Sequence, residues 1–301
     1  MTQCPTLLND SAQLIQATMS FASEYLAQLA AFSEQCPLPR VRALHLPPVQ
    51  PVQGHAGEFC AAELMDGSLG LSYVRLGDTL AQLRQGSAAL LPAGADALEV
   101  AQRFVGDKGP GRAVGLATAN AISRCLYDRA GFRPCDSSDS IGQMNAQAGE
   151  SIGMIGLFRP LLGRVLKSGA RLTVVELRAD LVGEHEGYRV TMDASELAAC
   201  SKVISTSTLL LNDTLDDMLA QCRNARWFAM IGPSAGCLPD ALFARGVTLL
   251  GGSWIKDGPG FVAALTSGAP HSEFSSKCAL TADAYPGWRE LIHRALDNQG
   301  T

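Results

Sequence analysis

The chain has 301 residues, of which 47% are hydrophobic and 18% are charged, and its formal net charge is -5. This composition excludes a disordered chain, and the acidic balance argues against nucleic acid or an anionic membrane as a partner, because such surfaces select clusters of Lys and Arg. The sequence contains no run of the roughly 20 apolar residues that a membrane span needs, and its first ten residues lack the positive start of a secretory signal. We therefore predict a cytoplasmic protein that contacts neither nucleic acid nor membrane.

The first 135 residues combine helical and β-prone segments. Apolar residues recur at helical spacing over residues 11–32, and a proline-rich linker follows at 46–51. Residues 57–65 and 69–76 favour two strands joined by Asp66-Gly67-Ser68, because Asp-Gly is a strong hairpin signal. Asp78 is expected to cap a helix that runs through Gln85, and residues 113–130 predict an apolar helix closed by Gly131. A hairpin followed by helices predicts an α+β domain over residues 1–135.

The polar, turn-forming stretch 135–140 marks the predicted boundary between two domains. Beyond it, short apolar strands alternate with single helices, which is typical of a parallel, doubly wound sheet. Strands are expected at 151–155, 171–177, 202–206, 227–231 and 247–250, and helices at 159–167, 194–200, 214–223 and 239–244. Residues 136–301 are therefore predicted to form a Rossmann-like α/β domain with a mainly parallel sheet and a C-terminal helical tail.

Open α/β sheets bind ligands at the carboxyl ends of their strands, and the first such loop here contains Gly156. Glu176 stands twenty residues later, at the end of the next strand, which is the spacing of the acid that meets a ribose hydroxyl in dinucleotide-binding folds. The full GxGxxG pattern is absent, because Phe158 and Arg159 stand where small residues should be. The alternative is a tight strand-to-helix turn with a solvated or salt-bridged glutamate.

The second loop is rich in hydroxyl side chains, which close the strand at 202–206 and continue beyond it: Ser205, Thr206, Ser207 and Thr208. Asn212, Asp213 and Thr214 then open the next helix. Hydroxyls and helix-start amides together form a suitable cradle for an anion or a polar ligand. The alternative is an elaborate helix cap, which accounts for Asn212 and its neighbours but does not require the four hydroxyls.

The third loop, at the end of the strand at 227–231, contains Gly232, Pro233 and Ser234. Glycine and proline fix the turn, and the serine offers a hydroxyl together with backbone amides. Cys237 follows near a helix start, where the pKa of a thiol is expected to fall, although no histidine is paired with it in the sequence.

These segments also carry a resemblance to a known family. Residues 204–214, 231–234 and 252–257 resemble the Rossmann-like domain called "putative heavy-metal chelation", and residues 114–121 resemble its companion domain, which has an enolase-N-terminal-like fold. The resemblance covers most of residues 10–268. It implies a cleft between the two domains and a role in metal or metal-chelate chemistry of a tetrapyrrole or cobalamin type.

The chain departs from that family pattern at two glycines. The family has Thr-Gly-Ser-Thr where this chain has Ser205 to Thr208, and Asn-Gly-Thr where this chain has Asn212-Asp213-Thr214. Residues with side chains leave the backbone less free to approach a ligand, so the binding mode is expected to differ here.

Cysteines and histidines give the metal hypothesis little independent support. The nine cysteines include no CxxC, and the five histidines include no HxH or HExxH. We expect reduced, mostly buried thiols without disulfides. His185 is expected in an exposed turn, and strand alternation puts His55 and Glu63 on one face but Cys60 on the other.

Asn120 is a further candidate, because it lies in the middle of an apolar helix. A buried amide must find hydrogen-bond partners. Either it bonds the hairpin as a structural residue, or it points into the cleft between the domains.

The leading hypothesis is a protein that handles a small molecule or a metal chelate in the interdomain cleft, with a transition metal or metal chelate as the implied cofactor. One alternative is an enzyme that uses NAD or S-adenosylmethionine through Gly156 and Glu176. Another is a non-catalytic carrier of metal or chelate. Whether the chain is an enzyme, and whether it forms a homodimer, is left open by the sequence.

Overall fold

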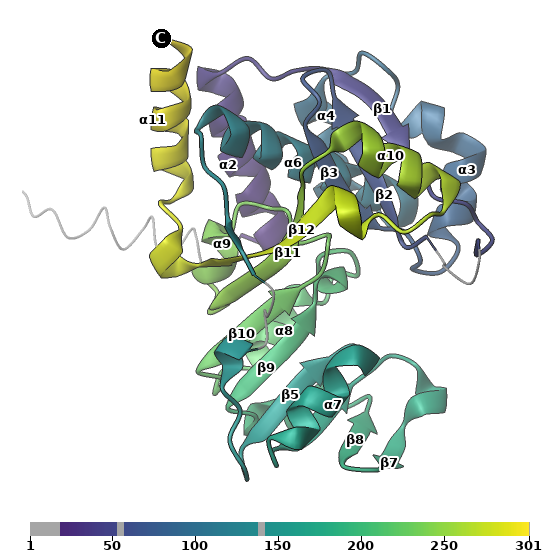
Figure 1. The fold of residues 1–301 in the computed structure, drawn as a ribbon, viewed down its shortest axis with the longest axis vertical. Helices are drawn as coiled ribbons and strands as arrows, with labels where there is room; N and C mark the ends of the chain where they lie inside the picture. Colours follow the sequence, from purple (N-terminus) through teal and green to yellow (C-terminus); the bar gives the residue numbers. More distant parts are fainter. Residues whose placement is uncertain (1–18, 53–56, 138–141, 301) are drawn as a thin grey trace, which may run out of the picture.

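The computed structural model describes residues 19–52, 57–137 and 142–300, and it has an upper and a lower part in Figure 1. The upper part contains the N-terminal elements together with the last helices of the chain, and the large sheet extends below them. None of the helices in these residues is both long and apolar enough to cross a membrane.

The N-terminal part is built on a three-stranded antiparallel sheet in the order β1-β2-β3. β2 (Phe59–Leu64) and β3 (Leu69–Tyr73) form the hairpin that the sequence predicts, and β1 (Val41–His45) adds a strand that it does not. The long helix α6 (Gly109–Arg129) lies across this sheet. Gly70 permits the close approach, because a Cβ at this position would lie 2.1 Å from the backbone nitrogen of Ala121. The remaining helices of this part are α2 (Phe21–Gln35), α3 (Thr79–Leu90), α4 (Ala97–Ala101) and α5 (Arg103–Gly106).

Two helix predictions for this part need comment. The apolar helix is confirmed, and Gly131 follows it with a φ of +61°, a left-handed conformation that suits glycine. The capping prediction for Asp78 is wrong: Asp78 occupies the N-cap position of α3, but its side chain makes no capping hydrogen bond, because its backbone (φ -100°, ψ 13°) is not in the extended conformation of an N-cap. α3 extends to Leu90 but is kinked at Gly86 (φ -141°, ψ 20°), directly after Gln85, where the sequence predicts the end of the helix. Of the helix expected at 11–32, residues 11–18 lie outside the described part.

The C-terminal part is a nine-stranded sheet in the order β4-β12-β11-β10-β9-β5-β6-β8-β7. All four strands from β10 to β6 pair in parallel, as predicted, and β11 and β8 extend the parallel arrangement on either side. The outer strands β12, β4 and β7 are antiparallel. The bounds are β4 (Cys135–Asp136), β5 (Ser151–Ile155), β6 (Arg171–Val175), β7 (Gly183–His185), β8 (Tyr188–Thr191), β9 (Lys202–Thr206), β10 (Trp227–Ile231), β11 (Leu249–Ile255) and β12 (Ser275–Thr281).

The connecting helices agree with the sequence in place but not always in type. The segment expected as a helix at 194–200 is the 3-10 helix η3 (Ala194–Ala199), and a second 3-10 helix, η4 (Ser207–Leu210), follows β9 directly. The α-helices are α7 (Arg159–Lys167), α8 (Leu215–Gln221), α9 (Asp240–Phe243), α10 (Gly258–Ser267) and α11 (Trp288–Gln299), and the short 3-10 helices are η1 (Gly142–Met144), η2 (Ala179–Leu181), η5 (Ser272–Phe274) and η6 (Ala282–Ala284). The sequence did not predict β4, β7, β8 or β12.

The end of the chain returns to the N-terminal part, where α11 packs against α6 and α2 (Figure 1). Asp240 anchors the return, since its carboxylate accepts a 2.7 Å hydrogen bond from the Tyr285 hydroxyl and a 3.2 Å bond from the Trp288 amide. Farther along, the Asn298 amide donates to the carbonyl of Arg129. The last helix thus fastens the two parts of the chain together.

Candidate functional site

The candidate site lies where the order of the parallel strands reverses. The chain passes from β5 outward to β6 and later returns to β9 on the other side of β5. The carboxyl ends of β5 and β9 therefore carry loops that diverge in opposite directions, which is the place where open α/β sheets bind their ligands. Gly156 follows β5 at this point, and Thr206 is the last residue of β9. We call the surface at the ends of these two strands the crevice.

Two glycines bring the backbone close to neighbouring loops at this edge. Gly156 has a φ of +81°, and a Cβ there would lie 3.0 Å from Cγ2 of Thr206. Gly232, after β10, has a φ of +147°, and a Cβ there would lie 2.2 Å from Oγ of Ser207. Position 156 therefore requires glycine because of both its backbone conformation and the contact with Thr206. Position 232 requires glycine chiefly because of the contact with Ser207.

The four hydroxyl residues after Ile204 divide into two pairs. Ser205 and Ser207 are buried, and the Ser205 hydroxyl donates to the backbone carbonyl of Thr206. Thr206 and Thr208 are half-buried and face each other, with the Thr208 hydroxyl donating to Thr206 Oγ1 over 3.1 Å and the Thr208 amide over 3.2 Å. The two threonines are therefore the partly accessible hydroxyls at the end of β9.

Asn212 acts within its own loop. Its Oδ1 accepts hydrogen bonds from the Thr214 hydroxyl (2.7 Å) and the Thr214 amide (3.3 Å), so the residue closes a local turn. Next to it, Asp213 has a φ of +57° and pairs with Arg112 of α6 over 2.5 Å. Arg112 also donates twice to the Leu210 carbonyl, so this loop is held by the N-terminal part of the chain.

Arg112 was not among the predicted residues. It is buried beside the Phe104 ring, and this burial lowers the pKa of its guanidinium, while Asp213 raises it. The signal available in the sequence was the position of Arg112, a cation directly before the predicted apolar helix at 113–130.

Glu176 organises the loops beside the crevice. One carboxylate oxygen accepts a 3.0 Å hydrogen bond from the Leu157 amide, and the other accepts from the amides of Leu177 (2.8 Å) and Arg178 (3.4 Å). Both oxygens thus bind backbone amides of the loops after β5 and β6. This bonding corresponds to the tight-turn alternative that the sequence left open for Glu176, with backbone amides as the partners in place of solvent or a cation.

The third loop is covered by the N-terminal part. The Ser234 hydroxyl is fully buried and accepts a 2.9 Å hydrogen bond from the Tyr73 amide at the end of β3. The Asn120 amide group donates to the carbonyls of both Leu71 and Ser234 at 2.9 Å, and its oxygen accepts from the Tyr25 hydroxyl at 3.2 Å. Asn120 therefore bonds the hairpin and the strand-end loop at once, and its amide is fully used.

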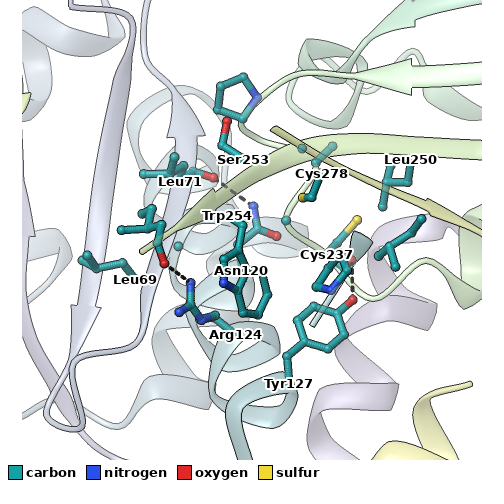
Figure 2. Close-up of a pocket in the computed structure, with 18 residues that line it drawn as sticks. Leu69, Leu71, Asn120, Arg124, Tyr127, Cys237, Leu250, Ser253, Trp254 and Cys278 are labelled. Carbon is teal, nitrogen blue, oxygen red and sulfur yellow. Dashed lines mark hydrogen bonds between the residues drawn. The ribbon is translucent and has the colours of Figure 1, made fainter. Parts of the chain in front are cut away.

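A cavity of about 40 Å³ remains between this loop and α6 (Figure 2). Pro233, Asn120, Tyr127 and Cys237 are among the residues that line it, and Figure 2 shows the Tyr127 hydroxyl bonded to the backbone carbonyl of Cys237. A space of this size holds water rather than an organic ligand. The expectation of a low pKa for Cys237 is wrong, because burial raises the pKa of this thiol to about 12.

Tyr73 is a second residue that the sequence did not indicate. Its backbone bonds Ser234, and its ring packs edge-on against Phe59 at a centroid distance of 5.7 Å. Burial raises the pKa of the Tyr73 phenol, and the neighbouring carboxylates of Glu58 and Glu176 raise it further, whereas Arg75 lowers it. The bond from its amide to Ser234 places Tyr73 beside the third loop. No local pattern could have indicated this, because it depends on how the two parts of the chain dock.

The donor set does not suit a bare metal ion. Within the described ranges, no group of three or more His, Cys, Asp or Glu side chains is arranged to hold one. His185 is exposed, as expected, and stacks on Tyr188, whereas Glu63 pairs with His45 over 2.8 Å. Cys60 is buried and the pKa of its thiol is raised to about 12; His55 lies outside the described residues. The implied metal therefore does not fit a site made of the side chains that the structure describes.

Comparison with known families identifies the class of protein. Two family models match the chain, one over residues 139–282 and one over residues 56–123, and both carry the description "Putative heavy-metal chelation". Together they account for more than two thirds of the chain. The chain belongs to this family, whose function is not established.

Particular relatives agree with this assignment. An uncharacterized protein of Methanocaldococcus jannaschii is 28% identical over 150 residues, which are 48% of this chain and 55% of that protein, so the match spans about half the length of the relative. Two solved structures of proteins of unknown function from the family of the C-terminal model share the fold. That from Pyrococcus horikoshii has a TM-score of 0.60 at 18% identity, covering 87% of this chain and 100% of the other. That from Desulfitobacterium hafniense has a TM-score of 0.61 at 18% identity, covering 87% and 98%.

Proposed function

We propose that this protein binds a small polar organic molecule, anionic or presented as a metal complex, in the crevice between the ends of β5 and β9. The observation that carries the proposal is the convergence of three features at the topological switch point: the glycine backbone at Gly156, the hydroxyls of Thr206 and Thr208, and the start of α7. Such a set of amides and hydroxyls recognises oxygen-rich ligands.

The charge distribution at the crevice favours an anion. α7 begins with Phe158 as its N-cap, which makes no side-chain capping bond, and the positive end of the helix dipole therefore points toward the crevice side of the sheet. Arg159 in the first turn is exposed and adds a full positive charge. The negative charge of Glu176 is offset by the three backbone amides that it accepts.

A metal would enter such a site as part of the ligand. The crevice offers hydroxyl groups and amides, which are weak metal ligands, and the two oxygens of Glu176 are already hydrogen-bonded. The molecule itself would therefore supply most of the donor atoms. The alternative of a nucleotide cofactor rests on the spacing of Gly156 and Glu176, and it requires Glu176 to give up backbone amides before it could meet a ribose.

Calorimetric titration with defined probes tests the proposal. Iminodiacetate and its Ni²⁺ complex should bind the wild type, whereas Ni²⁺ alone, NAD and S-adenosylmethionine should not. Thr208→Val should weaken binding of the iminodiacetate probes by about 1–2 kcal/mol, since it removes a hydroxyl that would contact the ligand.

Asn212→Ala is the matched control, because that side chain bonds its own loop and should leave binding unchanged at equal folding. Equal affinity of the Thr208→Val variant and the wild type for iminodiacetate would refute the site. Binding of NAD or S-adenosylmethionine in place of iminodiacetate would favour the nucleotide alternative.

A further inference from the structure

Exposed large apolar side chains are concentrated at one place in the C-terminal part of the chain. Among the described residues from 142 to 300, three such side chains are exposed: Leu177 by 69%, Val182 by 49% and Met192 by 53%. Single exposed apolar residues are ordinary, but a group at one location marks a binding surface.

The strand pairing brings these three residues to the same end of the sheet. Val175 pairs with Thr191, and the Glu176 amide donates to the Thr191 carbonyl over 3.0 Å, so Leu177 and Met192 both follow the paired ends of β6 and β8. Gly183 pairs with Val190, which sets Val182 at the same end of β7. Neighbouring strands lie about 5 Å apart, so the three positions form one short apolar rim.

This rim borders the crevice. Leu177 is the residue after Glu176, and the Glu176 carboxylate binds the Leu177 amide on one oxygen and the Leu157 amide on the other. The loop that starts the rim is therefore held to the loop that follows β5.

We propose that the rim of Leu177, Val182 and Met192 binds the apolar portion of the same ligand whose polar group occupies the crevice, so that the ligand class is an amphiphilic organic anion or its metal complex. This inference rests on the proposed function. A second copy of the chain suits the rim less well, because a stable interface buries about 800 Å² and 20–30 residues on each partner, and three side chains fall far short of this.

Two probes with the same polar group test the inference. Iminodiacetate and N-benzyliminodiacetate share both carboxylates and differ in a benzyl group that replaces a hydrogen on the nitrogen, so the ratio of their Kd values, compared between wild type and variants, reports the contribution of the rim. The wild type should bind the benzyl compound about tenfold more tightly, as expected for partial burial of one ring. Leu177→Ala combined with Met192→Ala should bring the ratio close to one and leave the Kd of iminodiacetate unchanged.

Met65→Ala is the matched control, since Met65 is 48% exposed at the hairpin turn between β2 and β3, and it should keep the tenfold ratio. A ratio near one in the wild type, or an unchanged ratio in the double variant, overturns the inference while binding of iminodiacetate leaves the proposed function standing. Failure of both probes to bind overturns the proposed function itself. A wild-type dimer in sedimentation that the double variant dissociates would assign the rim to a second copy instead.

Discussion

At the carboxyl ends of the parallel strands, the loop after β10 and the loops after β5 and β6 share a glycine and a polar residue but lie in different environments. We call them the covered half and, with the end of β9, the open half of this sheet edge. After β10, Gly232 and Ser234 lie under the N-terminal part, where the Ser234 hydroxyl is fully buried. After β5 and β6, Gly156 and Glu176 lead into a rim where Leu177 is 69% exposed. Gly232 and Gly156 each follow a buried strand with a positive φ, and a polar residue, Ser234 or Glu176, lies in or against the same loop. The difference arises from what covers the loops, because the loop after β10 is bonded to both β3 and α6.

This comparison shows that polar groups at strand ends serve two purposes in one fold. In the covered half they join the two parts of the chain, and hydrogen bonds from Asn120, Tyr73 and Arg124 cross the junction. In the open half the threonine hydroxyls bond chiefly to each other. Buried polar groups that are paired hold a structure together, whereas half-buried ones remain able to exchange water for a ligand. Substitutions of the same chemical kind should therefore lower stability in the covered half and ligand affinity in the open half.

The largest expected effect follows from Asn120→Ala. This change removes two donated hydrogen bonds and one accepted bond in a buried site, and leaves the Leu71 and Ser234 carbonyls without that donor. We expect a loss of about 3 kcal/mol in the free energy of unfolding, measured by urea titration, since each buried unsatisfied group costs about 1–3 kcal/mol.

Asn212→Ala is its control, because the same atoms are removed from a local turn. That variant should lose only about 1 kcal/mol. Equal losses in the two variants would mean that Asn120 does not join the two parts of the chain.

A smaller effect is expected for Gly156→Ala at the crevice. Alanine at a φ of +81° is strained, and its Cβ would lie 3.0 Å from Cγ2 of Thr206. We expect the two costs together to lower the free energy of unfolding by about 2 kcal/mol. Gly67→Ala isolates the conformational cost, because Gly67 has a φ of +88° and nothing within 4 Å of the added Cβ. If both variants lose the same amount in parallel urea titrations, the contact with Thr206 adds nothing to the cost of a side chain at position 156.

Much of the central sheet could be predicted from the sequence because its information is local. β5, β9 and β10 have the bounds that their short apolar segments and the turn residues beside them predict. The edges could not be predicted in this way. β4 has two residues, and β12 is a polar-to-apolar strand that pairs antiparallel with β11, so each is defined by a partner far away in the sequence.

The candidate site likewise contains residues that local sequence could predict and residues that it could not. Gly156 and the threonine hydroxyls follow from a strand end and its turn chemistry, both of which are readable in a few residues. The roles of Asn120, Ser234 and Tyr73 depend on the docking of the N-terminal part, since each bonds across the junction or lies beside it. The burial of Ser205 and Ser207 does not follow from a local alternation, because β9 is buried at successive positions and Ser207 begins the 3-10 helix η4.

The smallest changes in the free energy of unfolding are expected for Ser234→Ala and Thr208→Val. These two substitutions compare the covered and the open half most directly. Ser234→Ala removes a fully buried acceptor and leaves the Tyr73 amide unpaired, while the methyl group keeps the packing. It should lower the free energy of unfolding by about 1 kcal/mol, at the low end of the range for a buried unsatisfied amide. Thr208→Val removes a half-buried hydroxyl that donates only to Thr206, and the isosteric methyl group fills its place. Because water can replace the lost partner, the change in the free energy of unfolding should be within about 0.5 kcal/mol of zero. Parallel urea titrations of the two variants and the wild type measure both values. A loss at Thr208 as large as that at Ser234 would make the open half as structural as the covered one, and the threonine pair would then be a clamp on the end of β9 instead of a place for a ligand.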